Sequence, residues 1–323
     1  MGTYIVRRIL ISIPVLFGIT VLAFGALSLA PGDALTARVD PEVMARMTPE
    51  QVAALRRSLG LDQPAPVRYV LWLADLLQGN LGYSVVNKLP VAEELAARLG
   101  PTVILMSIAL VVGTTAGLIF GVLAAIRQYS PLDYAVTAFS TSFIAIPTFV
   151  TGLVLIYVFG AALKLLPTTG MTTLGKPFSL LDLGAHLVMP VLLLAVQLSA
   201  PLARYTRAAM LEVINSDYVT TARSKGLRGR IVLVRHAFRN ALIPIITIIG
   251  LSLPDLLAGA VITESLFGWP GMGQLAVKAA SGRDPALMMG VILVVATAVL
   301  VSNLITDILY GVVDPRVRLG GRS

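Results

Sequence analysis

The sequence predicts an all-α integral membrane protein with six membrane-spanning helices. Of its 323 residues, 56% are hydrophobic and only 13% are charged, and the mean hydropathy is +0.85. A soluble domain of this size does not need so much apolar surface. Six apolar segments are long enough for a helix to cross a bilayer, which takes about 20 residues. They are residues 9–30, 103–126, 135–163, 187–203, 241–262 and 287–312.

The first apolar segment is expected to remain in the membrane. It follows Arg7 and Arg8 and is longer than the apolar core of a signal peptide. Pro31 follows any small-residue cleavage point, so we expect an uncleaved span. Of the six spans, the third (residues 135–163) contains Pro147 and the fourth (residues 187–203) is the shortest.

Basic residues set the predicted orientation of the spans. The net charge is +8. Outside the long first loop, most Lys and Arg residues lie in segments on the same side as the N-terminus, above all in residues 204–239. Short loops rich in Lys and Arg stay in the cytoplasm, whereas long loops are exempt from this rule. We therefore expect both termini to be cytoplasmic, and the positive charge needs no nucleic-acid partner to explain it.

The first outer loop, residues 31–101, is predicted to be structured. Thr48 and Gln51 fit a helix capping box with Pro49 at the first helical position, and Gly60 follows the last turn of that helix.

Two more helices are expected in this loop. One begins near Pro66, and its apolar face with Trp72 indicates that it lies in the outer membrane interface. The other begins at Glu93 and Glu94 and ends at Gly100.

A polar, basic stretch, residues 216–244, interrupts the apolar segments. Asp217 or Ser216 can cap a helix over residues 218–225, and Gly226 can end that helix in the left-handed conformation. A second amphipathic segment follows, with apolar residues at spacings of three and four. Its apolar positions are Ile231, Val234, Phe238 and Ala241. Two short helices between membrane spans form a candidate docking surface.

This stretch resembles the cytoplasmic signature of the membrane permeases of binding-protein-dependent ABC importers. Gly226 is at the signature glycine, residues 220–222 stand where Glu-Ala-Ala would, and residues 236–239 stand where Ile-x-Leu-Pro would. The sequences of residues 218–227 and 236–244 are similar to those of the dipeptide/oligopeptide (nickel) branch of this family. Further segments similar to that branch are residues 30–33, 59–64, 79–84, 264–273 and 314–318.

The resemblance implies a type I ABC importer permease fold and transport by alternating access in the cytoplasmic (inner) membrane of a bacterium or archaeon. It also implies a paralogous permease partner in a heterodimer, two separate ATPase subunits and an external substrate-binding protein. The ATPase-coupling residues that it implies are Asp217, Tyr218, Thr221, Ala222, Arg223, Lys225, Gly226 and Leu227. The residues that it implies for an outer gate or binding-protein contact are Phe267, Trp269, Pro270 and Gly271.

The sequence predicts no nucleotide, cofactor or metal site of its own. Residues 170–176 match the first positions of a phosphate-binding P-loop, but Pro177 replaces the Ser or Thr that would hold magnesium and lacks a backbone N–H. We interpret this stretch as an outer loop. The chain has no cysteine and only two histidines, which disfavours a metal site.

Two acidic residues are candidates for the substrate pathway. Asp255 lies inside the fifth span, where a carboxylate costs about 2.5–3.5 kcal/mol unless it faces the bundle interior or water. It contacts substrate in one interpretation and is satisfied by a neighbouring helix in the other. Glu264, at the outer end of that span, is a candidate contact for substrate or the binding protein.

The resemblance therefore implies a permease subunit that imports di- or oligopeptides, driven by ATP that separate subunits hydrolyse. Nickel or another small solute is the alternative within this class, an ion-driven secondary transporter is the alternative outside it, and a membrane enzyme is disfavoured. Basic residues of the polar stretch can also contact membrane lipid. The predicted organisation is residues 1–30, 31–101 and 102–323, with a cytoplasmic coupling loop at 209–240.

Overall fold

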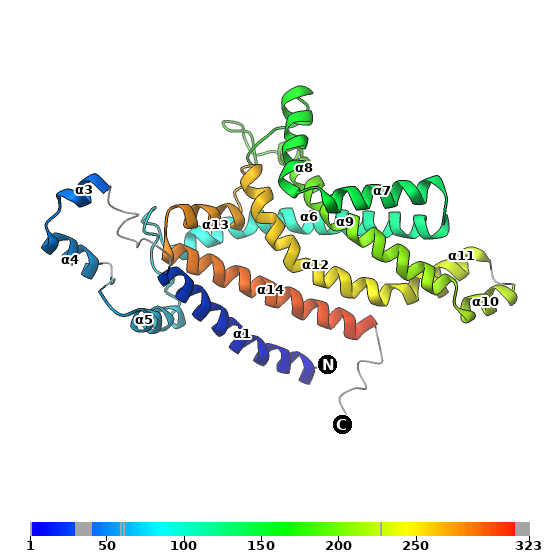
Figure 1. Ribbon diagram of the computed structural model, residues 1–323, viewed down its shortest axis with the longest axis horizontal. Helices are drawn as coiled ribbons and strands as arrows, with labels where there is room; N and C mark the ends of the chain where they lie inside the picture. Colours follow the sequence, from blue (N-terminus) through cyan, green and yellow to red (C-terminus); the bar gives the residue numbers. More distant parts are fainter. Residues whose placement is uncertain (1, 30–40, 59, 61, 227, 314–323) are drawn as a thin grey trace. The chain divides into compact units, whose positions relative to one another are not determined.

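The computed structural model of the protein describes residues 2–29, 41–58, 60, 62–226 and 228–313. Within these residues the regular structure is helical, apart from one isolated antiparallel bridge between Tyr83 and Pro90. The arrangement of the helices is drawn in Figure 1. An all-α fold is therefore confirmed for the described part of the chain.

Four helices of the described part are long and apolar enough to cross a membrane. A fifth span is present if two helices separated by a sharp bend are counted together. The helix α12 (Arg239–Leu266) is 28 residues long, but several of its side chains lie outside the described residues. The count of six spans therefore stays a prediction. The four spanning helices are α1 (Gly2–Leu29), α6 (Val91–Ile126), α9 (Leu180–Ile214) and α14 (Pro285–Val313).

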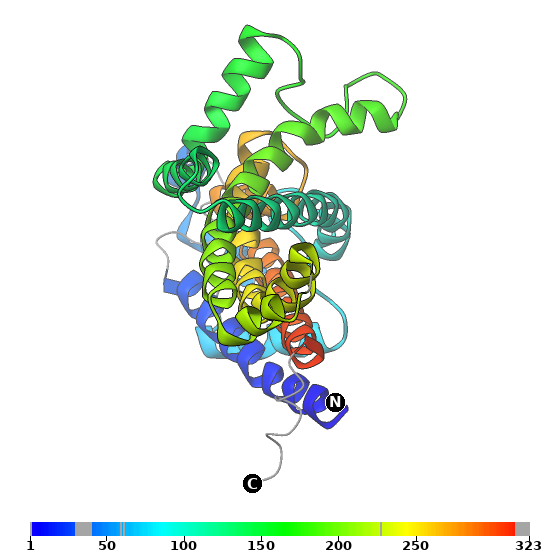
Figure 2. The same cartoon turned by 90° about the vertical axis from the view of Figure 1, so that its right-hand side faces the viewer.

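The third predicted span is not one straight helix. Helix α7 (Pro131–Ala145) is followed by α8 (Thr148–Leu155), which continues into the π-helix η1 (Ile156–Ala162). The two parts meet at an angle of 106°, and α8 leaves the direction of α7 in both views of Figures 1 and 2. A proline disfavours helical backbone in the residue before it, and Ile146 is extended, with φ −82° and ψ 126°.

The fourth predicted span is longer than expected. The sequence predicts residues 187–203 as the shortest span, whereas α9 has 35 residues and includes Pro190 and Pro201. Both α7 and α12 pack against α9, and many of its side chains are buried, among them Leu194 and Leu202. Burial of an apolar stripe stabilises a helix beyond its local preferences, which explains why α9 continues through its prolines.

Three glycines let α6 approach α9 closely. Gly113, Gly117 and Gly121 are four residues apart on α6, the spacing of small residues that lets membrane helices come together. A Cβ atom at Gly121 would lie 2.5 Å from the Thr206 Cβ and 2.6 Å from the Ala203 carbonyl oxygen. These helices therefore pack backbone against backbone.

The predicted helices of the first outer loop are confirmed at two of three places. In α4 (Pro49–Ser58), the Thr48 N–H donates to Gln51 Oε1 at 2.9 Å and the Gln51 N–H donates to Thr48 Oγ1 at 3.3 Å. Gly60 has a φ of +65° after the last turn. The next helix, α5, spans Ala65–Leu77 as expected. An additional short helix, α3, spans Pro41–Arg46.

The third predicted helix does not end at Gly100. Instead α6 runs without interruption from Val91 through Pro101 to Ile126. An internal proline costs a helix about 3 kcal/mol. Val91 and Leu95 before it, and Leu105 after it, are buried, and this burial outweighs the cost.

The chain forms two compact units, each with its own apolar core. One is built mainly from Val103–Trp269 and the other from Val6–Thr102 and Pro270–Leu300. The division of the sequence into residues 1–30, 31–101 and 102–323 stays a prediction.

A buried carboxylate links the two chain segments of the unit that consists of Val6–Thr102 and Pro270–Leu300. Asp284, 1% exposed, accepts hydrogen bonds from Ser84 Oγ at 2.6 Å and from the Val86 N–H at 3.3 Å. Its other oxygen accepts from the Leu287 N–H at 3.0 Å, which caps the first turn of α14. Asp284 thus attaches the outer loop near the bridge at Tyr83 to the start of α14.

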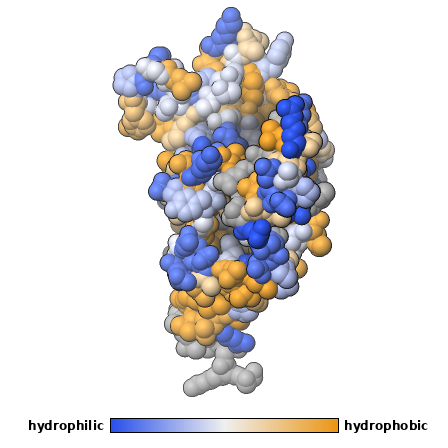
Figure 3. Space-filling model, turned by 90° about the vertical axis from the view of Figure 1, so that its left-hand side faces the viewer, coloured by the Kyte–Doolittle hydropathy of each residue, from blue (hydrophilic) through white to orange (hydrophobic). Residues whose placement is uncertain are grey.

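Much of the surface is apolar, as a membrane protein requires. On α1, Leu10 and Leu22 are 60% and 74% exposed. Broad hydrophobic areas lie between hydrophilic ones on the face drawn in Figure 3.

Candidate functional site

The predicted coupling loop folds into short helices between α9 and α12. After α9 ends at Ile214, the chain forms α10, turns at Lys225 and Gly226, and re-enters a helix at Gly229. From Gly229 to Leu266 the helical run has no break, because the caps that separate its three parts are themselves in the right-handed helical region. The elements of this segment are α10 (Asp217–Ser224), α11 (Gly229–Ile231) and the π-helix η2 (Val232–Phe238), which leads into α12.

A small apolar cluster anchors α10. Val219 is fully buried and Val232 is 2% exposed, and both pack with Val213 near the end of α9. One buried valine therefore attaches α10 to the helical run that becomes α12, and the same cluster attaches it to α9. These contacts connect α10 both to α9 and to the helical run that becomes α12.

The start and end of α10 largely follow the sequence prediction. The Val219 and Thr220 N–H groups donate to the Ser216 carbonyl at 3.1 and 3.2 Å, so Ser216 precedes the first turn. Its hydroxyl donates to the Val213 carbonyl at 2.6 Å instead of capping the helix. Gly226 has a φ of +75°, the left-handed conformation predicted for the residue after the helix.

The opposite face of α10 is open to solvent. Tyr218 is 45% exposed, and Asp217, Thr221, Ser224 and Lys225 are exposed too. We call these five residues, which lie on the side of α10 away from Val219 with Lys225 directly after its last turn, the outer face of α10; the name refers to the helix and not to the outside of the membrane. The side chains of Ala222 and Arg223 and the whole of Leu227 lie outside the described residues.

The helix after Gly229 follows the predicted apolar pattern only in part: Ala241 is buried and Phe238 is partly buried, as expected. The sequence predicts Ile231 on the buried face, but Ile231 is 43% exposed, whereas Val232 and Ala237 are 2% and 1% exposed. In a π-helix the hydrogen bonds join residues five apart, so the buried positions of η2 also fall five apart. The Val234 side chain lies outside the described residues. The buried face of η2 packs against α9 and α12.

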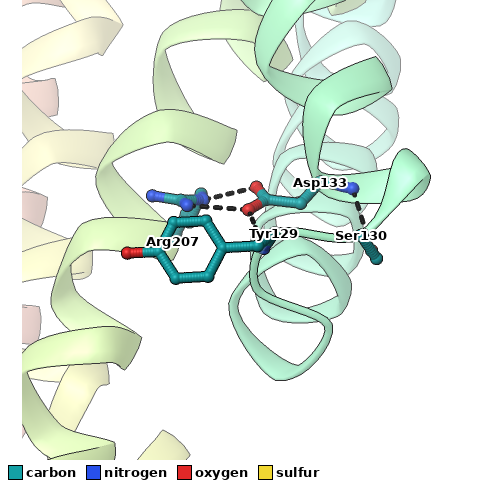
Figure 4. Close-up of polar contacts among 4 residues, drawn as sticks. All are labelled: Tyr129, Ser130, Asp133 and Arg207. Carbon is teal, nitrogen blue, oxygen red and sulfur yellow. Dashed lines mark hydrogen bonds and ion pairs between the residues drawn. The ribbon is translucent and has the colours of Figure 1, made fainter.

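An ion pair fixes the turn between α6 and α7 onto α9 (Figure 4). Arg207 on α9 donates from Nε to Asp133 Oδ1 at 2.6 Å and from Nη2 to Oδ2 at 2.8 Å. The Asp133 side chain is only 3% exposed, and that of Arg207 is 26% exposed. Asp133 Oδ2 also accepts from the Tyr129 N–H at 2.9 Å, and Ser130 Oγ accepts from the Asp133 N–H at 3.3 Å.

This ion pair was not predicted from the sequence. Ser130 and Asp133 form an S-x-x-D pattern before an apolar run, a sequence signal for a helix start. That pattern would have placed Asp133 in the first turn of α7. Its partner Arg207 is 74 residues away in sequence, and no local pattern connects the two.

Comparison with known proteins identifies the family. Residues 117–319 match the family described as binding-protein-dependent transport system inner membrane component. Residues 1–107 match the N-terminal family of the same membrane components. The chain belongs to this family.

Curated relatives cover the permease from end to end. The oligopeptide transport system permease protein AppB of Bacillus subtilis is 44% identical over 318 residues, which are 98% of this chain and 99% of the relative. The di/tripeptide transport system permease protein DppB of Pseudomonas aeruginosa is 39% identical over 341 residues, covering 98% and 99% of the two chains. The membership inferred from the motif around Gly226 is confirmed.

A solved structure supports the fold. A chain of the MetNI methionine ABC transporter, in an inward-facing conformation, aligns with a TM-score of 0.56 at 18% identity. The alignment covers 68% of the permease and 96% of that chain. The predicted importer-permease fold is therefore confirmed, apart from the number of spans.

Two outer-gate candidates of the permease are buried in its core. Trp269 is fully buried and packs with Leu105 and Leu194, while Phe267, 2% exposed, packs in a separate cluster with Met189. Aromatic side chains with this much burial hold the segment in place. Their role as contacts for a binding protein stays a prediction and requires this segment to move.

The remaining outer candidates are less accessible than a docking surface requires. Glu264 is fully buried, so direct contact with substrate also needs a rearrangement. Pro270 is half-buried and Gly271 is buried. Asp255 lies in α12, but its side chain is outside the described residues, and its role stays a prediction.

The P-loop-like stretch of the permease is a loop held by its own contacts. Asp182 accepts from the Thr173 N–H at 2.7 Å and from Thr173 Oγ1 at 2.6 Å, and the Gly170 N–H donates to the Phe267 carbonyl at 2.8 Å. The Thr173 N–H and hydroxyl are therefore both bonded to the Asp182 carboxylate.

Proposed function

We propose that the permease imports small peptides as one subunit of an ATP-driven transporter. In this proposal two separate ATPase subunits supply the energy, an external binding protein supplies the substrate, and a paralogous permease completes a heterodimer. The peptide substrate is supported by the relatives, whose names refer to oligopeptides and di/tripeptides. The observation that carries the proposal is the position of α10. Its outer face is exposed, and on its opposite face Val219 packs against Val232 in the helical run that becomes α12.

The mechanism follows from these attachments. Closure of the ATPase subunits displaces α10, which rests in a cleft of one of them. Because Val219 packs against Val213 and Val232, the displacement acts on both α9 and the run from Gly229 to Leu266. The Asp133–Arg207 ion pair makes the α6–α7 turn move with α9. Helices that move together alternately open the pathway outward and inward, so the permease contributes geometry and the ATPases contribute the chemistry.

Transport assays in vesicles test this function. We expect vesicles that contain both permeases and both ATPases to take up a radiolabelled tripeptide only with ATP and the binding protein present. Dissipating ion gradients with ionophores should leave this uptake unchanged. Uptake that is driven by an ion gradient without the ATPases would establish a secondary transporter instead. Uptake of nickel but not of tripeptide would reassign the substrate.

The orientation of the permease is proposed to place both termini and α10 in the cytoplasm. The chain has no cysteine, so single introduced cysteines report their own positions. Ser224 on α10 and Ser281 on α13 (Met272–Ser281) are both exposed. We expect a membrane-impermeant maleimide to label Ser281→Cys on intact cells and Ser224→Cys only after lysis. Labelling of Ser224→Cys on intact cells would reverse the orientation.

A further inference from the structure

A cavity of about 500 Å³ lies at the bend between α7 and α8, against α9. This volume is within the range of about 300–1,000 Å³ that small-molecule sites occupy. The bend provides Phe143 and Thr148, and α9 provides Gln197, Pro201, Arg204 and Tyr205. All of these residues belong to one compact unit.

The charge of the cavity favours an anionic group. None of the described residues that line it is acidic. Arg204 is exposed and forms no ion pair with any residue in the described part of the chain. Its guanidinium can donate two parallel hydrogen bonds to a carboxylate. The situation of Arg207, one turn further along α9, is different because Asp133 occupies its guanidinium.

The neutral polar groups of the cavity match a peptide backbone. Gln197 donates one hydrogen bond to Thr148 Oγ1, and its amide makes no other with the described residues, so its second N–H and its carbonyl oxygen can serve a ligand. Pro201 has no N–H, so the backbone carbonyl four residues earlier, that of Gln197 itself, lacks its usual helical partner. The Tyr205 hydroxyl adds a further donor or acceptor. Amide-like donors and acceptors beside one cation suit a short chain of peptide groups that ends in a carboxylate.

The apolar part of the cavity does not select a particular side chain. Phe143, Ile144 and Ile146 provide walls of general apolar character. Such walls accept many side chains, while the polar groups fix the main chain. The exposure of Arg204 keeps its ion pair with a ligand weak, as a transport pathway needs if the ligand is to leave again.

We propose that this cavity is a substrate site of the permease, which binds the main chain of a short peptide and pairs Arg204 with its C-terminal carboxylate. The inference rests on the proposed function of peptide import. It assigns a recognition step to the permease itself, in addition to any selection by the binding protein.

Uptake of two peptides by the complete transporter in vesicles tests the site. One peptide is a tripeptide with a free C-terminal carboxylate, and the other is the same tripeptide with a C-terminal amide. We expect Arg204→Gln to lower the initial rate for the free acid about threefold to fivefold, because the exposed charge pair that is lost contributes at most about 1 kcal/mol. The rate for the amide should change less than about twofold. Both peptides arrive through the same binding protein, so its own preference cancels when each rate is divided by that of the wild type.

Two further variants complete the test. Arg127→Gln removes an exposed guanidinium that does not line the cavity, and we expect it to leave both rates unchanged. Ala145→Trp places a large side chain at an exposed position of the lining and should lower both rates. Stimulation of ATP hydrolysis by the binding protein should persist in all three variants, which separates loss of the site from loss of coupling.

The outcomes distinguish the site from the function. No uptake of either peptide by the wild type would overturn the proposed function together with the site. Wild-type uptake with an equal effect of Arg204→Gln on both peptides would overturn the site alone. An effect that depends on anionic lipid in the vesicles, and not on the peptide carboxylate, would make the cavity a contact for lipid phosphate instead.

Discussion

Gly226→Val is expected to abolish peptide uptake while the permease still inserts and assembles. Gly226 has a φ of +75°, and a Cβ there would meet no atom within 4 Å. The cost of valine is therefore backbone strain, about 1–2 kcal/mol, and no clash accompanies it. Relief of that strain changes the direction in which the chain leaves α10, so the outer face of α10 no longer fits its ATPase.

Two glycines provide matched controls for this variant. Gly229, in the same segment, has open space around it and no positive φ. Gly175, in the P-loop-like stretch of residues 170–176, has a φ of +79° and open space around it. Gly229→Val tests bulk without strain, and Gly175→Val tests the same strain away from the coupling segment. We expect both to retain uptake and ATP hydrolysis stimulated by the binding protein, and Gly226→Val to lose both. Near wild-type uptake by Gly226→Val would remove the turn from the transmission path.

Arg207→Ala is expected to destabilise the permease by about 3–5 kcal/mol. The substitution leaves the Asp133 carboxylate, 3% exposed, without the two hydrogen bonds from the guanidinium. Removing one member of a buried pair costs more than removing both, because an uncompensated charge stays buried. The thermal unfolding midpoint of the purified permease in detergent measures the loss.

Three further variants serve as comparisons for the unfolding midpoint of Arg207→Ala. Arg127→Ala removes an exposed arginine near the same turn and should shift the midpoint little. Arg207→Lys keeps the charge but cannot make both bonds, so its midpoint should fall between those of Arg207→Ala and the wild type. The double variant Asp133→Leu with Arg207→Met should recover most of the stability lost in Arg207→Ala. A midpoint of Arg207→Ala equal to that of Arg127→Ala would contradict a structural role for the pair.

Features set by local chemistry could be predicted from the sequence. The Thr48–Gln51 capping box and the positive φ of Gly226 depend on residues within one turn of each other. The family follows from a motif of the same kind, read around Gly226. In each case the signal is contained in a few consecutive positions.

Features that depend on tertiary contacts were not predicted. The helix α6 continues through Gly100 because of burial on both sides of Pro101, and η2 changes the spacing of buried residues because its hydrogen bonds join residues five apart.

The candidate site divides in the same way. Residues of α10 carry a recognisable pattern, whereas Arg207 acquires its role from a residue 74 positions earlier. The glycines Gly113, Gly117 and Gly121 are an instructive exception. Their spacing is visible in the sequence, and it is the known spacing of close helix packing. Only the structure shows that the helix packed against them is α9.

A photo-cross-link from α10 tests the central claim, that its outer face contacts a separate ATPase subunit. Thr221 is exposed on that face, and Thr221→Cys can carry a benzophenone maleimide in the otherwise cysteine-free chain. Ser281→Cys with the same reagent is the control. The account predicts that illumination of the assembled transporter joins Thr221→Cys to the ATPase, that Ser281→Cys forms no such product, and that the cross-linked transporter stops uptake. Failure of Thr221→Cys to cross-link to the ATPase in a transporter that is active in uptake would contradict it.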